Sequence, residues 1–382
     1  KDSNVQFGEG GAGTFSDGKL TSRSKDNISL EIKKILVEFG AKEEILYLSK
    51  PHIGTDRLQK IIPAIREEII KLGGKIFFSS QLTDIKINND AISEIQINQK
   101  EKIVTDKLIL AIGHSSRDTY AMLSEKGISM EAKPFAVGFR IEHPQEFINI
   151  SQYGKYADLQ KLPAAEYVLK NTNKRDNRSC FSFCMCPGGK IINSSSEENG
   201  IVVNGMSFSK RNDFFSNSAL VVNVRKEDYY ENSVLDGIKF QRTFEEKAFQ
   251  KSGSIFEAPA SYIKDFIKSR KSGKINKTSF TPNLCEADLS KFYPAFINNA
   301  FRSSLNVFNK QIEGFIDTNP VIIAPETRTS SPVRINRDDF SGQSVNVKGL
   351  YPVGEGAGYA GGIMSAAIDG WRTAEKIIDE LL

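Results

Sequence analysis

A glycine-rich segment near the C-terminus has the residue types that bind a polar cofactor. Gly354, Glu355, Gly361 and Gly362 lie between the apolar run GLYPV and a helical pattern that starts at Ile363. A helix start offers free backbone N–H groups and a partial positive charge, and glycines let a ligand approach the backbone closely. Glu355 could accept a hydrogen bond from a cofactor hydroxyl. The segment therefore predicts a cofactor site, with a purely structural strand-to-helix turn as the alternative.

A second glycine-rich segment stands near the N-terminus. Residues 8–13, GEGGAG, match the pattern G-x-G-x-x-G. The dinucleotide-binding fingerprint needs an apolar strand before the glycines and a helix after them. Here KDSNVQF precedes the glycines and the polar stretch TFSDGKLTSR follows them. We interpret the segment as a cofactor-facing loop of another kind, with an ordinary flexible loop as the alternative.

Histidine and arginine side chains are the candidates for proton transfer and substrate binding. His114 follows the buried-strand pattern LILAIG, which ends at Gly113, and His52 lies in the loop KPHIGTD. Arg328 and Arg334 lie in the polar segment ETRTSSPVR and could bind an anionic substrate with bidentate geometry. We take Arg328 as the substrate anchor and His52 and His114 as proton-transfer groups. Ordinary loop residues and a solvated hairpin turn are the alternatives.

Three of the four cysteines are crowded into the segment CFSFCMC. These are Cys180, Cys184 and Cys186, whereas Cys285 lies far away in the sequence. The pattern is no disulfide framework, and a Cys-x-Cys pair forms a disulfide only with strain. No second pair of metal ligands stands at zinc-site spacing, so we predict reduced, metal-free thiols. Inert packing is favoured over a reactive thiol.

The composition indicates a globular protein of two to three domains. The chain has 382 residues and a net charge of +4, which does not predict nucleic-acid binding. No apolar run approaches the roughly 20 residues that span a bilayer, so no membrane partner is expected. No signal peptide is recognisable, and a cytoplasmic location is expected. Because the chain starts at Lys1 without a methionine, we expect a trimmed chain or a fragment.

The elements that must position these residues follow from the periodicity of apolar side chains. Helical spacing predicts helices over residues 27–39, 56–72 and 363–382. Thr55 or Asp56 is expected to cap the second helix, Gly73-Gly74 to end it, and Pro63 to kink it or delay its start. The apolar face of the last helix is expected to run as far as Leu381.

Between the second and third helices the period changes to that of strands. Strands are predicted over residues 75–79, 82–87, 92–97 and 103–112. The last of them contains KLILAIG, a continuous apolar run typical of a strand buried on both faces. From about residue 135 to 325 the chain is richer in Phe, Tyr, Asn, Ser and Lys, which indicates a domain inserted between two pieces of the first.

Seven segments together resemble one protein family over nearly the whole chain. They are GEGGAGTFSDGKLTSR, KPHIGTDRL, LAIGHSSRDT, KPFAVGFRIEHPQ, SFCMCPGG, ETRTSSPVRI and GLYPVGEGAGYAGGIMSAA. In this order they resemble bacterial proteins known as FAD-dependent or NAD(FAD)-utilizing dehydrogenases, within the flavoproteins that have two dinucleotide-binding domains. Members of that family begin with a further region that carries the true G-x-G-x-x-G.

The resemblance implies an α/β fold with an incomplete Rossmann-like FAD-binding domain, whose first βαβ unit is missing, and an inserted α+β substrate domain. The FAD-binding domain would comprise residues 1–134 and 325–382, and the inserted domain residues 135–324. The cofactor contacts implied by the resemblance come from Gly10, Gly11, Gly13, Thr14, Ser16, Gly113, Gly354, Glu355, Gly361, Gly362 and Ile363.

The activity implied is hydride transfer through the flavin N5 atom to or from a small-molecule substrate, with NAD(P)H as the possible electron donor. A flavin-dependent RNA-modifying enzyme and a non-catalytic flavin-binding protein are the alternatives. Without the fingerprint region the 382-residue chain is expected to bind FAD weakly, to purify colourless and to self-associate through open sheet edges, as a possible homo-oligomer.

Overall fold

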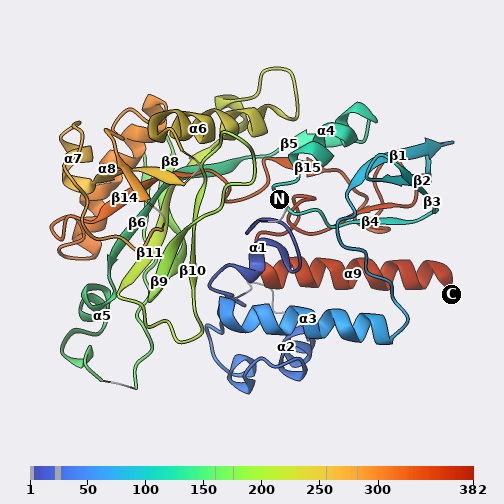
Figure 1. Cartoon of the computed structure of the whole chain (residues 1–382), viewed down its shortest axis with the longest axis horizontal. Coiled ribbons are helices and arrows are strands. Elements are labelled where there is room, and N and C mark those ends of the chain that lie inside the picture. The colour runs from blue at the N-terminus through green and yellow to red at the C-terminus, as the bar shows by residue number, and fades with distance from the viewer. Residues whose placement is uncertain (1–3, 22–26, 160, 175, 255, 282) are drawn as a thin grey trace.

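The fold is that of a computed structural model, whose elements are labelled in Figure 1. It describes residues 4–21, 27–159, 161–174, 176–254, 256–281 and 283–382. The α-helices within these residues are α1 (Gly11–Thr14), α2 (Asn27–Glu38), α3 (Thr55–Lys71), α4 (Arg117–Glu125), α5 (Gln145–Tyr153), α6 (Asp236–Ser252), α7 (Ile263–Ile267), α8 (Ala295–Gln311) and α9 (Ile363–Leu381). Short 3-10 helices cover Glu43–Leu46, Gly154–Tyr156 and Lys226–Asp228.

The strands fall into one large sheet and several small ones. They are β1 (Leu82–Asn88), β2 (Ala91–Ile97), β3 (Glu101–Val104), β4 (Leu108–Leu110), β5 (Met130–Ala132), β6 (Phe135–Pro144), β7 (Lys170–Asn173), β8 (Arg178–Cys186), β9 (Gly189–Asn193), β10 (Val203–Ser207), β11 (Phe215–Val224), β12 (Glu257–Tyr262), β13 (Asn283–Glu286), β14 (Val321–Glu326), β15 (Val333–Ile335) and β16 (Leu350–Pro352). The described part of the chain is thus a mixed α/β structure.

The large sheet has seven strands, in the order β13-β12-β14-β6-β11-β8-β7. Its neighbours pair antiparallel except β12 and β13, which are parallel. The longest ladder joins β6 and β11, where Phe135 lies opposite Val224 and Pro144 opposite Phe215. All strands of this sheet come from residues 135–326, on the left of Figure 1.

Helices α6, α7 and α8 pack on one face of this sheet around an aromatic core. The side chain of Phe139 on β6 is fully buried, and its ring lies 4.9 Å from the ring of Phe301 and 5.6 Å from that of Phe266. On β6 the residues that alternate with this apolar set include Arg140 and Glu142, which are buried as well. Strand side chains point alternately to the two faces, so the second face carries buried polar groups.

The remaining elements surround the C-terminal helix. Helices α2 and α3 and the start of α9 share a core that contains Leu36, Leu58, Met364 and Ile368. Strands β1, β2 and β3 form an antiparallel sheet, and β4 pairs in parallel with β16. In Figure 1 these elements lie to the right of the large sheet, with α1 between the two groups. No helix in the described ranges combines the length and the apolar character needed to cross a bilayer.

The predictions of the helices are confirmed, and several details are wrong. Helix α3 begins at Thr55 rather than later, contains Pro63 and ends before Gly73. Neither predicted cap acts as one, because the Thr55 hydroxyl donates to the Thr14 carbonyl and the Asp56 carboxylate accepts from Ser209. The predicted apolar face of α9 is buried only in its first half, because the residues beside its far end contact the polar side chain of Glu380, whereas Leu381 is 67% exposed.

Two of the predicted strands are confirmed, as β1 and β2. The predicted strand 75–79 is wrong, since these residues form no strand and Phe77 and Phe78 are exposed. A strand needs a neighbour to satisfy its backbone, and none lies beside this segment among the described residues. The predicted strand 103–112 is instead two short strands, β3 and β4, interrupted at residues 105–107. Burial on both faces is also wrong, because Ile109 is 52% exposed.

Candidate active site

Two loops that follow the parallel strands β4 and β16 meet at one edge of that pair. Gly356 approaches Gly113 so closely that a Cβ at position 356 would lie 2.6 Å from the Gly113 carbonyl oxygen. Gly113 and Gly354 both have positive φ values, 67° and 75°, which favour glycine. The hydroxyl of Tyr120 on α4 donates to the Gly356 carbonyl at 2.6 Å and fixes the second loop.

The contact between the loops places His114 against Glu355. The imidazole Nδ1 lies 3.1 Å from the carboxylate Oε1, and the two side chains are 11% and 27% exposed. Nε2 of the same ring is buried and has no hydrogen-bond partner in the described structure. A carboxylate beside Nδ1 favours the tautomer with its proton there, which leaves Nε2 with a free lone pair. The sequence predicted both residues singly but not their pairing.

The glycines before α9 leave open space where a ligand could lie. A Cβ added to Gly361 or Gly362 would meet no atom within 4 Å. The Gly361 N–H donates to Ser365 Oγ at 3.2 Å, so that donor is engaged, whereas the first N–H groups of any helix lack intrahelical partners. Because α9 has 19 residues, the partial positive charge at its start is fully developed.

The N-terminal glycine loop packs beside this helix start. A Cβ on Gly13 would lie 3.3 Å from the side chain of Ile363. Residues 4–10 form no strand, and α1 that follows is a single turn, so the described part of the segment lacks the elements of a dinucleotide fingerprint. Residues 1–3, and Ser22 and Arg23 of the motif, lie outside the described residues.

Within this loop the predicted cofactor residues make local contacts. Gly10 has a φ of 78° and Gly11 a φ of 54°. The Thr14 carbonyl accepts the Thr55 hydroxyl, and the Thr14 hydroxyl is buried without a partner in the described structure. Ser16 closes a turn, since its hydroxyl donates to the Gly13 carbonyl at 2.7 Å and accepts from the Gly18 N–H at 3.0 Å.

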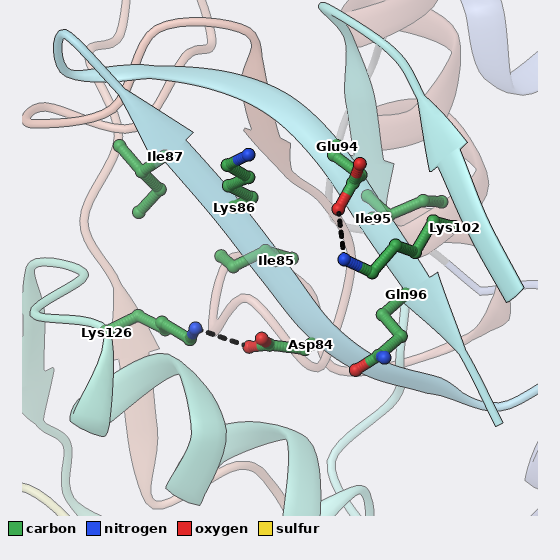
Figure 2. A pocket seen from close by; sticks show the side chains of 9 residues that line it. All are labelled: Asp84, Ile85, Lys86, Ile87, Glu94, Ile95, Gln96, Lys102 and Lys126. Carbon is green, nitrogen blue, oxygen red and sulfur yellow. Dashed lines mark ion pairs between the residues drawn. The ribbon is translucent and has the colours of Figure 1, made fainter. Parts of the chain in front are cut away.

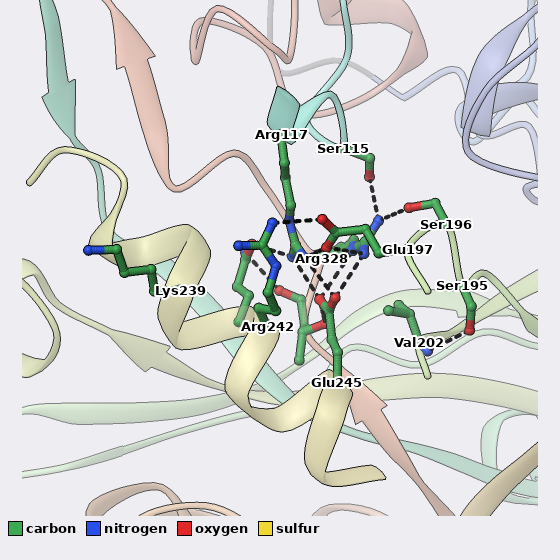
Figure 3. A network of polar contacts seen from close by, with 12 residues as sticks. Ser115, Arg117, Ser195, Ser196, Glu197, Val202, Lys239, Arg242, Glu245 and Arg328 are labelled. Atoms are coloured by element: carbon green, nitrogen blue, oxygen red, sulfur yellow. Dashed lines mark hydrogen bonds and ion pairs between the residues drawn. The ribbon is translucent and has the colours of Figure 1, made fainter. Parts of the chain in front are cut away.

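Arg328 lies in a buried ionic network, shown in Figure 3. Its Nη2 lies 2.8 Å from Glu245 Oε2 and its Nε 3.1 Å from Oε1 of the same carboxylate. Arg117 binds the same carboxylate from α4, with both of its distances at 2.8 Å. Glu197 contacts Arg117 and Arg242 at the more exposed side. The guanidinium of Arg328 is therefore already engaged by a protein carboxylate.

The network also shows which polar residues sequence reasoning missed. Burial alone would raise the pKa of Glu245, but the guanidiniums of Arg328 and Arg117 outweigh it and hold this pKa well below its usual range. Glu245 is 1% exposed and lies on α6, where its spacing gave no signal that it is buried. Arg328 Nη1 also donates to the Ser115 hydroxyl at 3.2 Å, which ties the network to the loop that carries His114.

His52 lies in a different cluster from His114. Its Nε2 is 3.2 Å from the Ser209 carbonyl, and Lys19 pairs with it in an isolated β-bridge. Burial, followed by the positive charge of Arg211, lowers the pKa of His52. Arg211 binds Asp17 through two nitrogens and thereby joins the N-terminal loop to the large-sheet region. Among the described residues no hydrogen bond or ion pair links His52 to His114 or Glu355, so the two histidines lie in separate clusters.

Two grooves are present, and one of them reaches the N-terminal glycine loop. One, of about 400 Å³, crosses the β1–β2–β3 sheet, and Figure 2 shows two ion pairs among its lining side chains, Lys126 with Asp84 at 2.6 Å and Lys102 with Glu94 at 3.5 Å. The other, of about 440 Å³, lies between Gly8 and the far end of α3. Among the described residues no group of three His, Cys, Asp or Glu side chains is placed to hold a metal ion.

Known proteins resemble this chain in sequence and, more weakly, in structure. The family model described as FAD-dependent protein, C-terminal domain-like, matches residues 134–329. An uncharacterized protein of Clostridium beijerinckii is 47% identical over 381 residues, which are 99% of this chain and 71% of that protein.

Among solved structures, glycine oxidase from Bacillus cereus has 10% identity and a TM-score of 0.33, over 87% of this chain and 58% of its own length. An oxidoreductase from Methanosarcina mazei has 11% identity and a TM-score of 0.32, over 95% of this chain and 64% of its own. CtdE, solved with FAD and a substrate, has 11% identity and a TM-score of 0.32, over 87% of this chain and 58% of its own. The chain spans less than two thirds of each of these proteins, and scores this low do not establish a shared fold.

Proposed function

Because this chain belongs to the family of FAD-dependent proteins defined by that C-terminal domain-like region, we propose that it acts as a flavin-dependent oxidoreductase on a small-molecule substrate. The flavin end of FAD would lie at the start of α9, between the loop 353–362 and the N-terminal loop 8–16. NAD(P)H is the proposed electron donor. The observation that carries the assignment of this site is the pair His114–Glu355, in which the ring nitrogen facing away from Glu355, Nε2, is buried and has no hydrogen-bond partner among the described residues.

The residues present at this place fit a flavin. Gly361 and Gly362 leave open space beside the backbone, and the helix start supplies N–H donors and positive charge. A reduced flavin carries negative charge at its pyrimidine edge, which such a helix end stabilises. When bound, FAD would supply hydride transfer through its N5 atom. Glu355, Gly361, Gly362 and Ile363 are the proposed contacts to the pyrimidine edge and the ribityl chain.

His114 is the proposed proton-transfer group of this chain. Glu355 accepts the Nδ1–H and holds the ring, so that Nε2 can take a proton from a substrate group or return one. Ser115 continues the same loop and accepts a hydrogen bond from Arg328, which anchors the loop to the buried network. Arg328 is therefore proposed to hold the loop of His114 in place through Ser115, because its guanidinium is already bound by Glu245. This replaces direct substrate anchoring as its proposed role.

The large-sheet region supplies the proposed cover of the substrate pocket. It contacts the N-terminal loop through Arg211 and Asp17, and the loop of His114 through the network around Glu245. These two polar contacts hold the region against both segments that carry proposed cofactor residues. We propose residues 135–324 as the domain that shapes substrate choice.

The test is the visible spectrum of the natural-length protein with FAD, before and after NADH or NADPH is added. Bleaching of the flavin absorbance under exclusion of oxygen is the expected result, and the faster of the two nucleotides identifies the donor. His114→Gln should keep the flavin content and slow turnover of the substrate. A natural-length protein that takes up no flavin would contradict the proposal.

A further inference from the structure

Strand β8 carries a bulge at the second cysteine of the segment CFSFCMC. Along β11 the step from Asn217 to Ala219 is two residues, whereas the partners on β8, Cys186 and Phe183, are three residues apart. The extra residue lies between Phe183 and Cys186. Within this stretch Cys184 has a φ of 44°, which is rare for a residue other than glycine. A bulge re-aims a side chain, and a residue held in such a conformation is a reason to look for function.

A fully buried arginine faces both cysteines. Arg140 Nη2 donates to the Cys184 carbonyl at 2.7 Å and lies 3.3 Å from Cys186 Sγ. Its other nitrogens bind Glu326 at 3.1 Å and Asn217 at 2.7 Å. The guanidinium fits because position 205 is glycine: a Cβ there would lie 2.0 Å from Nη2. The sulfur in contact with Arg140 is that of Cys186, and the positive charge acts to lower the pKa of both thiols.

A second positive charge reaches the same strand from the N-terminal loop. Lys19 Nζ donates to the Met185 carbonyl and lies 3.5 Å from Glu166. The charged groups that act on the two sulfurs include Arg140 from β6, Glu326 from β14, Arg211, and Asp17 and Lys19 from the loop. The bulge therefore lies where the large sheet meets the loop proposed to face the cofactor.

The two sulfurs share a proton unequally. A hydrogen bond from Cys186 lowers the pKa of Cys184, and the charges of Arg140 and Lys19 lower it further. The same hydrogen bond, together with burial, raises the pKa of Cys186. Cys184 is half-buried and Cys186 fully buried. Cys184 is thus the more exposed residue of the two, and its thiolate form is favoured over that of Cys186.

We propose that Cys184 and Cys186 form a thiol–disulfide exchange site, with Cys184 as the attacking sulfur, Cys186 as the resolving sulfur, and a disulfide as substrate. The inference stands independently of the proposed flavin chemistry. The proposal does not include the other two cysteines. Cys180 is fully buried, and burial raises the pKa of Cys285.

The exchange is balanced without another reagent. The Cys184 thiolate attacks one sulfur of a disulfide R–S–S–R, the S–S bond breaks, and one thiolate leaves. Cys186 then gives up its proton and attacks the Cys184 sulfur, which releases the second R–S group as a thiol. The pair loses two electrons and becomes a disulfide, which carries the strain expected of Cys-x-Cys and is therefore readily reduced again by thiols, and the substrate gains two electrons and becomes two thiols.

The test uses 4,4′-dithiodipyridine, a small disulfide whose thiopyridone product absorbs light, on the whole chain. Wild type should release two thiopyridones in its fast phase and leave no adduct on either cysteine. Cys186→Ser should release one in that phase and keep a mixed disulfide on Cys184, located by mass spectrometry. Cys184→Ser should lose the fast phase, and the matched control Cys285→Ser should keep it.

The pH dependence gives a second readout. At pH 6 Cys184 should react roughly tenfold faster than Cys285, because its larger thiolate fraction outweighs its lower nucleophilicity. Lys19→Gln should lower the rate at which Cys184 reacts with the probe at pH 6. At high pH its rate should equal that of wild type, and its circular dichroism spectrum should be unchanged. Equal rates for Cys184 and Cys285, or a persistent adduct on Cys184 in wild type, would overturn the proposal.

Discussion

Nδ1 of His114 lies 3.1 Å from Oε1 of Glu355, although one residue follows β4 and the other follows β16, far apart in the sequence. The contact depends on the close approach of Gly356 to Gly113, which no larger residue at position 356 would permit. The pair orients one imidazole nitrogen toward the protein and leaves the other without a partner. Its orientation, rather than the histidine alone, is what makes the site suited to proton transfer.

The first prediction concerns this orientation. In wild type, nitrogen NMR should find neutral His114 with its proton on Nδ1, because Glu355 accepts that proton. Glu355→Ala should abolish the preference and lower the affinity for FAD about tenfold, the effect of one charge-assisted hydrogen bond. A neutral ring protonated mainly on Nε2 in wild type would show that Glu355 does not set the tautomer.

The second prediction concerns the open space before α9. Gly362→Val should leave the thermal midpoint nearly unchanged, because Gly362 has an extended backbone and an added Cβ meets no atom. It should weaken FAD binding by about tenfold or more, through loss of close backbone approach. The matched control is Gly370→Ala in the middle of α9, which should leave FAD binding unchanged. Equal FAD affinity in both variants would contradict the placement of the flavin.

The third prediction concerns Glu245. Glu245→Ala would leave Glu197, at the more exposed side, as the one carboxylate among the described residues that pairs with the buried guanidiniums of Arg117 and Arg328, so the free energy of unfolding should fall by about 3–5 kcal/mol in urea. Arg242→Ala, at the exposed side of the same network, should cost at most about 1 kcal/mol. Similar losses in the two variants would mean that the buried pairs contribute no more than the exposed one.

Glu245 also determines how the free energy of unfolding changes in acid. Its pKa in the folded chain lies below its ordinary value, so its contribution is fully present above that value and is lost as pH falls below about 4.3. Glu245→Ala should therefore lose less stability than wild type on acidification from pH 5. The measurement is the urea midpoint of unfolding of both proteins at pH 5 and again below pH about 4.3.

The fourth prediction concerns His143. Burial lowers its pKa to about 4, and its Nε2 donates to the Phe315 carbonyl at 2.9 Å. Below pH about 6.5 the unfolded chain takes up a proton that the folded chain refuses, so stability falls as pH drops toward 4. The effect approaches about 2–3 kcal/mol near pH 4.5. His143→Gln should flatten this dependence.

The control for His143 is the difference between the two proteins at each pH. Burial raises the pKa of Glu326 to about 7, and its contribution runs the other way, gaining stability as pH falls below 7. Because Glu326 is present in both proteins, it cancels in the difference. Parallel pH profiles for wild type and His143→Gln would show that the ring is protonated in the folded chain.

The sequence predicted elements whose signal is local. The helices α2, α3 and α9 were found from apolar spacing, and β1 and β2 from the change to the period of strands. The segment 75–79 has the composition of a strand, but a strand also needs a neighbour, which no local pattern contains. Cap residues failed for the same reason: Asp56 is used by Ser209, a residue far along the chain.

The candidate site was predicted as separate residues and not as an arrangement. Glycine spacing indicated the loop before α9, and the strand ending at Gly113 indicated His114. Nothing in the sequence indicated that Glu245 would be the shared partner of two arginines, since a glutamate on a helix is ordinarily solvated. The bulge at Cys184 depends on ladder register and was likewise invisible.

The parallel pairing of β4 with β16 has a consequence for synthesis. Leu108 leaves the ribosome long before Leu350, its partner in that ladder, and at about 5–20 residues per second the interval lasts roughly ten to fifty seconds. Throughout it, the nascent chain displays an apolar strand and the loop of His114 without their support. Slower translation would lengthen this vulnerable period, so the yield of the protein should depend on chaperones that shield nascent chains.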